Sequence, residues 1–98
     1  MGNSVKSARF LMESRMHDAM RGDTDACFEL GMVYSSGSGG LSIDLIEAHK
    51  WFNLAARHGD IRAQQCRAEI AEDMTAREIA EAQRQARAIL HLNSARAA

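Results

Sequence analysis

Apolar residues recur along this chain at steps of three and four, the spacing typical of amphipathic helices. The first stripe lies within 4–21 and consists of Val5, Ala8, Met12, Met16 and Ala19. The next two stripes are Ala26, Leu30, Val33 and Tyr34, then Leu45, Ala48, Trp51, Phe52 and Ala55. The last two are Ala63, Cys66, Ile70 and Met74, then Ile79, Ala82, Ala86, Ile89 and Leu90. The pattern predicts an all-α protein of about five antiparallel helices.

Capping residues define where these helices begin and end. The residues able to cap the second to fifth helices are Asp23 or Thr24, Asp44, Asp60 and Thr75. Asp44 and Thr75 are followed three residues later by Glu47 and Glu78, which predicts two capping boxes with the glutamate returning to the cap amide. Gly59 fits the left-handed residue that closes many helices.

The segments outside the predicted helices are small and polar. Residues 35–40 read Ser-Ser-Gly-Ser-Gly-Gly, a flexible turn that only Leu41 and Ile43 could anchor by packing. The tail after Leu92 is expected to fray.

A Gly-Asp pair occurs twice, at Gly22-Asp23 and Gly59-Asp60, and an alanine follows each aspartate after three residues. The offset of about 37 residues lies in the range of helical solenoid repeats. This spacing indicates a repeated pair of helices.

One unit of this pattern closely resembles the Sel-like repeat, a bacterial and eukaryotic relative of the tetratricopeptide repeat. The residues that carry the resemblance are Ala26, Leu30, Gly31, Tyr34, Gly37, Gly39, Asp44, Ala48, Trp51, Phe52, Ala55, Ala56 and Gly59. The resemblance implies a short right-handed α-α superhelix that binds proteins or peptides and has no catalytic residues of its own. From the residues themselves, we expect Gly31 to allow close helix contact and Trp51 to fill the core.

The resemblance divides the single domain, 1–98, into unequal parts. Residues 22–59 match best, and 1–21 look like the second half of a preceding unit in which Ser14 and Arg15 replace the aromatic pair. Residues 60–92 look like a degenerate capping unit, because Arg67-Ala68 replaces the Leu-Gly pair, and 93–98 form the tail.

The function expected from this reading is a protein-interaction module, an adaptor or scaffold, whose groove is formed by the second and fourth helices. The groove residues are predicted to be Asp25, Glu29, Met32, Ser36, Arg62, Gln65 and Glu69. These positions have another interpretation as ordinary solvated helix surface. The partner is a protein or peptide of unknown identity.

The alternative function is structural self-association. Phe10 lies about 160 degrees from the apolar stripe of its helix. An exposed aromatic there is available to a second copy of the chain, as in a homodimer. A lone exposed aromatic is the competing interpretation.

Charge and composition exclude some partners. The chain has 12 Lys and Arg against 13 Asp and Glu, with the two signs mixed, so no basic patch for nucleic acid is visible. No segment has the length and hydrophobicity of a membrane span, and the first residues lack a secretory signal pattern. A cytoplasmic location is expected, with Cys27 and Cys66 as reduced, structural thiols.

Catalytic chemistry is not indicated. Gly37 to Gly40 lack the Lys-Ser or Lys-Thr of a phosphate-binding loop. No two of the four histidines have the i, i+4 spacing that presents two imidazoles to one metal. No base accompanies either cysteine, and Glu69, Glu72 and Asp73 are typical of a solvated face. We therefore expect no enzymatic activity, no cofactor and no metal.

Overall fold

The computed structural model describes residues 3–97 of the chain, and the side chains of residues 9–96. This part contains five α-helices and no strand, which confirms the all-α prediction. A short 3₁₀ helix, η1, covers Ser38–Gly40. The α-helices are α1 (Asn3–Met20), α2 (Thr24–Ser36), α3 (Leu45–Arg57), α4 (Ile61–Ala71) and α5 (Ala76–Ala97).

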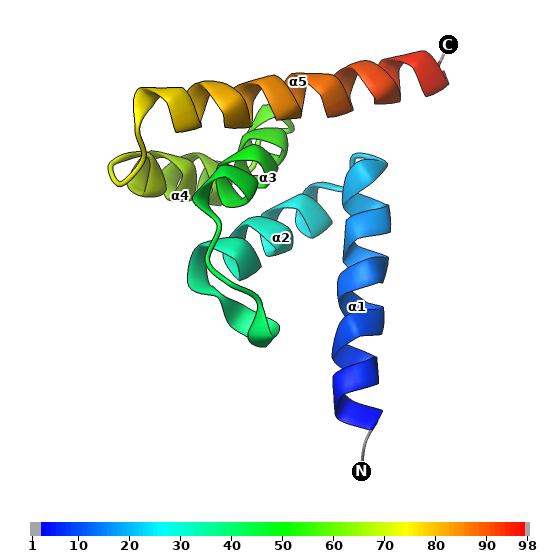
Figure 1. Ribbon diagram of the computed structural model, residues 1–98. Coiled ribbons are helices and arrows are strands. Elements are labelled where there is room, and N and C mark those ends of the chain that lie inside the picture. The colour runs from blue at the N-terminus through cyan, green and yellow to red at the C-terminus, as the bar shows by residue number, and fades with distance from the viewer. Residues whose placement is uncertain (1–2, 98) are drawn as a thin grey trace.

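Helix α3 occupies the centre of the molecule. It packs against α2, α4 and α5, while α1 packs against α2 (Figure 1). The N-terminal half of α1 extends away from the other helices, and its last turn enters the core through Ala19, which is fully buried. The chain is therefore a five-helix assembly organised around α3.

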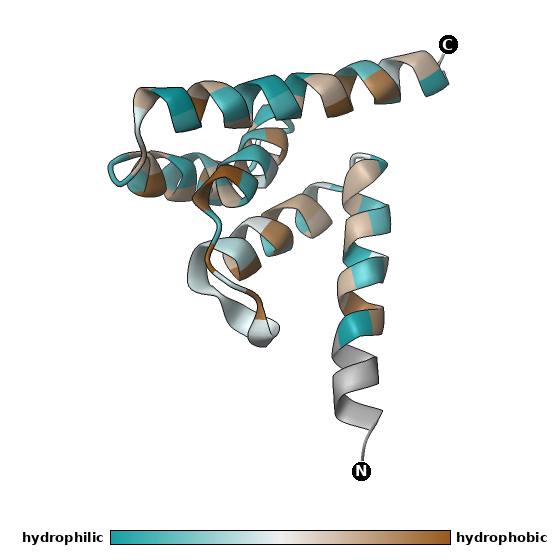
Figure 2. Ribbon diagram, viewed as in Figure 1, coloured by the Kyte–Doolittle hydropathy of each residue, from teal (hydrophilic) through white to brown (hydrophobic). Residues whose placement is uncertain are grey.

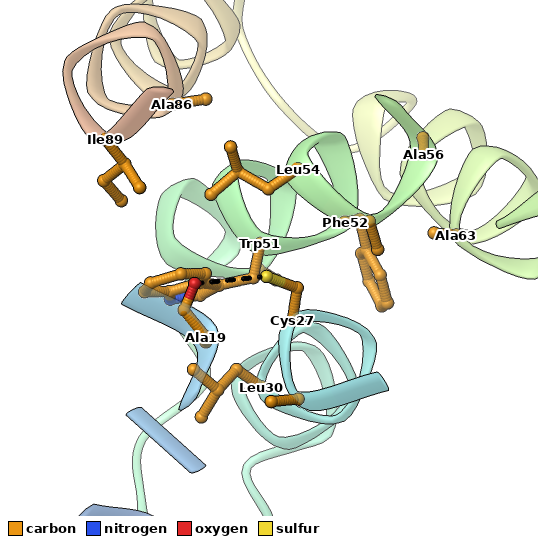
Figure 3. Packing of buried hydrophobic residues seen from close by; sticks show 13 residues of the cluster. Ala19, Cys27, Leu30, Trp51, Phe52, Leu54, Ala56, Ala63, Ala86 and Ile89 are labelled. Atoms are coloured by element: carbon orange, nitrogen blue, oxygen red, sulfur yellow. Dashed lines mark hydrogen bonds between the residues drawn. The ribbon is translucent and has the colours of Figure 1, made fainter. Parts of the chain in front are cut away.

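The core confirms the expected role of Trp51. Trp51 and Phe52 are 1% and 0% exposed, and together with Leu30 and Cys27 they are the largest fully buried side chains of the described residues. Figure 3 shows Trp51 among Ala19 from α1, Leu30 from α2 and Ile89 from α5. One aromatic side chain thus connects four helices.

Gly31 permits the close contact between α2 and α3. A Cβ atom at this position would lie 2.4 Å from Cδ1 of the Phe52 ring. Real Cβ atoms do not approach other atoms so closely, and the ring is fully buried. The absence of a side chain at Gly31 therefore lets the Phe52 ring lie directly against the backbone of α2.

The two Gly-Asp turns are built from the same hydrogen bonds. Gly22 and Gly59 have φ angles of 95° and 92°. Their amides donate to the carbonyls of residues three earlier, Ala19 and Ala56, at 3.0 and 2.9 Å. The carboxylates of the two following aspartates accept from the amides of Ala26 and Ala63, at 2.9 and 3.2 Å. Asp23 rather than Thr24 is therefore the cap of α2.

One of the two predicted capping boxes is complete. Thr75 and Glu78 exchange hydrogen bonds between their side chains and backbone amides, at 3.1 and 2.8 Å. At the start of α3 only half forms, because Asp44 accepts from the Glu47 amide but its own amide donates to the carbonyl of Tyr34. The Glu47 carboxylate accepts from Lys50 and Trp51 instead, so the predicted bond from the Asp44 amide to Glu47 is wrong.

Three local expectations differ from the structure. Helix α5 continues to Ala97 instead of ending near Leu92, and α4 ends at Ala71, which leaves Met74 in the following turn. Ile43 lies beside Gly37 but is 62% exposed, so the half-buried Leu41 is the better anchored of the two residues. Hydrophobic and hydrophilic positions alternate along α5 (Figure 2), and its buried residues are Ala82, Ala86 and Ile89.

Candidate functional site

Two of the predicted groove residues, Asp25 of α2 and Arg62 of α4, lie close to each other. The Arg62 side chain, from the first turn of α4, extends to α2, where its Nη2 lies 3.6 Å from Oδ1 of Asp25. The guanidinium is also paired with both carboxylate oxygens of Asp60, at 2.8 and 3.2 Å. Arg62 therefore connects the two helices on the side where the groove is predicted.

Most of the remaining groove residues are accessible to a partner. Met32 is 43% exposed, a large value for an apolar side chain in the middle of a helix. The exposed polar members of the set are Asp25, Ser36, Arg62, Gln65 and Glu69. The Ser36 hydroxyl donates to the Met32 carbonyl at 2.8 Å and is bonded to the Ser38 hydroxyl, so it is occupied within its own turn.

Glu29 differs from the other predicted groove residues. Its carboxylate forms an ion pair with Arg15 on α1, not with a residue of α4. Glu29 therefore belongs to the contact between α1 and α2.

Phe28 is part of this surface, although the sequence interpretation did not include it. The Arg62 guanidinium lies over its ring, 4.1 Å from the centroid, and the ring also contacts Phe52 at a centroid distance of 5.8 Å. A signal was present in the spacing, because Asp25, Phe28 and Met32 follow one another at steps of three and four. We name Asp25, Phe28, Met32, Arg62 and Gln65 the α2–α4 surface.

A second polar cluster connects α3 with α5. The Glu47 carboxylate accepts hydrogen bonds from Nζ of Lys50 at 2.7 Å and from Nε1 of Trp51 at 3.1 Å. Lys50 also donates to the Gln85 amide oxygen and lies 5.0 Å from the Trp51 ring centroid. This cluster satisfies the polar atoms around a buried tryptophan and lysine, which gives it a structural role.

His49 is a buried polar residue of α3. It is 3% exposed, and its Nδ1 has no hydrogen-bond partner among the described residues. Burial, assisted by the positive charge of Arg67 on α4, lowers the pKa of His49. Arg67 itself donates a hydrogen bond to Asn53 of α3. The contact between α3 and α4 therefore brings a buried histidine close to an arginine.

Neither cysteine has the environment of a reactive thiol. Both are free, Cys27 is buried, and its Sγ lies 3.6 Å from the Ala19 carbonyl oxygen (Figure 3). Burial, followed by the charge of Asp23, raises the pKa of Cys27 to about 12, and burial also raises the pKa of Cys66. Raised pKa values keep both groups in the thiol form, which is a poor nucleophile.

The signature residues are distributed between core and turns. The apolar members on helices are buried, except Tyr34, which is half-buried against the core. Gly37, Gly39 and Gly59 have positive φ angles, and Asp44 caps α3. They pack the helices together or shape the turns between them.

The described part of the chain lacks both a cluster of metal ligands and a membrane-spanning helix. Within residues 3–97, no three His, Cys, Asp or Glu side chains are grouped so that they would hold a metal ion. In that range no helix combines the length and the apolar character that crossing a bilayer requires.

On α1, Phe10 is 70% exposed, and its neighbour Leu11 is 56% exposed. Phe10 faces away from the core, as expected from its position opposite the stripe. The partly buried methionines of this helix, Met12, Met16 and Met20, pack against the core cluster. Val5 and Ala8 of the predicted stripe lie outside the described side chains.

Comparisons with known proteins give no further assignment: no family model matches the chain, nor does any curated protein or solved structure.

Proposed function

We propose that this chain is a non-catalytic helical-repeat module, similar to the Sel-like repeat, that binds a protein or peptide on the α2–α4 surface. Two observations support the repeat: the Gly-Asp turns have the same hydrogen bonds 37 residues apart, and α1–α2 and α3–α4 are successive helix pairs. A repeat of this kind uses helix faces, rather than a catalytic site, for its function.

The observation that carries the proposal is the position of Arg62. Its side chain crosses from α4 to Asp25 and covers Phe28 on α2, so residues of two helices form one continuous surface. Met32 adds an exposed, adaptable apolar side chain four residues beyond Phe28 on α2. Such a surface suits an extended or helical peptide held by several modest contacts.

A peptide-display selection on the purified chain, followed by affinity measurement, tests the proposal. Met32→Asp should weaken the selected peptides about tenfold or more, because it places a charge in the apolar contact. Leu92→Asp is the matched control, since Leu92 on α5 is similarly exposed at 48%. Both variants should keep the parent melting temperature within a few degrees. Equal affinities of the two variants would place the binding surface elsewhere.

Self-association through α1 is a second candidate function, supported by the exposure of Phe10 and Leu11 side by side. Static light scattering over a wide concentration range should then show dimers in the parent and monomers in Phe10→Asp. A parent that stays monomeric at high concentration removes this candidate.

A further inference from the structure

Three side chains surround the Arg62 guanidinium. The Phe28 ring lies beneath it, with the centroid 4.1 Å from Cζ, and Asp60 holds it with two hydrogen bonds. Asp25 approaches from α2 at 3.6 Å. We name the group formed by Asp25, Phe28 and Asp60 the cation site.

Arg62 is not required to hold this group in place. Asp60 caps α4 through the amide of Ala63, a bond made whether or not Arg62 is present. The Phe28 ring is positioned by Phe52, and Asp25 is fixed to α2 by its backbone. Arg62 itself is 62% exposed, whereas the Asp60 side chain paired with it is only 7% exposed. A buried carboxylate requires a cationic partner, so a second guanidinium can take the place of Arg62 while Asp25, Phe28 and Asp60 stay in position.

The charges of the cation site favour one class of partner. With Arg62 displaced, two carboxylates flank the edge of an aromatic face, an arrangement that attracts a guanidinium or ammonium group and repels an anion. Arginine suits it better than lysine, because its planar group can stack on the ring and pair with Asp60 through two hydrogen bonds, as Arg62 does. Met32, four residues beyond Phe28 on α2, lies about 6 Å further along the helix and is available to an apolar neighbour of that arginine.

We infer that the cation site takes an arginine side chain of the bound peptide, and that Arg62 is its displaceable occupant within the free chain. The inference rests on the proposed function and adds the partner class, a basic peptide with an apolar residue beside the arginine. A partner that used Arg62 as its own anchor would instead be acidic, so the two chemistries have opposite consequences when Arg62 is removed.

The experiment uses an acetylated, amidated decapeptide with one arginine and one leucine two residues apart in a Gly-Ser background. A second peptide replaces the arginine by citrulline, which keeps the shape and removes the charge. Each is titrated into the ¹⁵N-labelled full chain, and amide shifts of residues 25–32 and 61–65 are followed by NMR. The arginine peptide should bind about three- to fivefold more tightly than the citrulline peptide.

Variants separate the site from general charge effects. Arg62→Ala should bind the arginine peptide about threefold or more tightly than the parent, because the competing side chain is gone. Arg84→Ala, which removes an arginine from a local pair with Glu81 on α5, is the matched control and should leave affinity unchanged. Phe28→Leu should reduce the difference between the two peptides, because the stacking face is lost while Asp25 and Asp60 still favour the charged peptide.

Three results would overturn the inference: weaker binding by Arg62→Ala, equal affinity of the arginine and citrulline peptides, or shifts confined to other helices. Each of these leaves the proposed function intact if display-selected peptides still lose affinity in Met32→Asp. Loss of that sensitivity as well would reject the proposed function itself.

Discussion

In the first helix pair, α1–α2, and in the second, α3–α4, the same Gly-Asp turn joins the two helices, but the chemistry of the helix contact differs. At the turn, Ala19 and Ala26 in the first pair, and Ala56 and Ala63 in the second, are all buried. Small residues at these positions allow the two backbones to approach closely in each pair.

Further along the helices the two pairs diverge. At an offset of 37 residues, the positions that correspond are Met12 and His49, Met16 and Asn53, and Leu30 and Arg67. The first pair therefore packs through apolar side chains, whereas the second contains a hydrogen bond from Arg67 to Asn53 and the buried His49. Turn geometry and small residues are shared, while the flanking positions accept either kind of contact.

The largest expected effect concerns Trp51. Its counterpart in α1, 37 residues earlier, is the small polar residue Ser14. Trp51→Ala should cost roughly 3 to 5 kcal/mol of unfolding free energy, because the side chain fills the space between four helices. Ser14→Ala, at an exposed position, should change stability by less than about 0.5 kcal/mol. Urea denaturation measures both, and similar midpoints for the two variants would contradict a core centred on α3.

Local signals predicted much of this arrangement from the sequence. The helix stripes, the Asp and Thr caps and the glycine turns depend on neighbouring residues, and the structure has most of them where the pattern indicated, although Met74 lies in the turn after α4. The predicted partner of the Glu47 carboxylate, the Asp44 amide, was wrong. The carboxylate binds the Lys50 and Trp51 side chains instead, and that choice depends on how α3 is buried.

The candidate surface was predicted less completely, for a related reason. Helical spacing alone allows both Phe28 and Glu29 to share a face with Asp25 and Met32, since steps of three and four both follow one side of a helix. Only the position of α1, whose Arg15 draws the Glu29 carboxylate, distinguishes them. The contacts of α2 with α1 and with α4 join residues far apart in the chain, so local spacing does not predict them.

A second prediction compares Gly31 with its counterpart Ala68, which is exposed. Gly31→Leu should destabilise the chain by about 1 to 3 kcal/mol or more, since even a Cβ atom would meet the Phe52 ring. Ala68→Leu should stay within about 0.5 kcal/mol. Thermal melting followed by circular dichroism compares the two. A stable Gly31→Leu variant would show that α2 and α3 can separate at little cost.

The polar contact of the second pair predicts a dependence on pH. The unfolded chain protonates His49 near the ordinary pKa of 6.5, whereas the folded chain, with its pKa lowered by burial and Arg67, resists the proton to lower pH. The unfolded state then binds more protons, so stability should decline as pH falls below about 6.5.

Met12 is the residue of the first pair that corresponds to His49, so His49→Met introduces the same residue in the second pair. Melting temperatures of parent and variant between pH 7.5 and 5 should diverge as the pH falls, with the variant losing less. Parallel curves would mean that the folded chain accommodates the protonated imidazole.

The smallest effect is expected for the ion pair of the first helix pair, Arg15 with Glu29. Both side chains are partly exposed, at 46% and 42%, so Glu29→Gln should reduce stability by less than about 1 kcal/mol. The difference in stability from the parent should shrink further at 1 M salt, because the Debye length there is only about 3 Å and the ion pair is screened. Because the carboxylate is directed to α1, Glu29→Gln should also leave peptide affinity on the α2–α4 surface unchanged, in contrast to Met32→Asp. Fluorescence anisotropy with a display-selected peptide makes the comparison, and a loss of affinity in Glu29→Gln comparable to that of Met32→Asp would extend the binding surface across α2 toward α1.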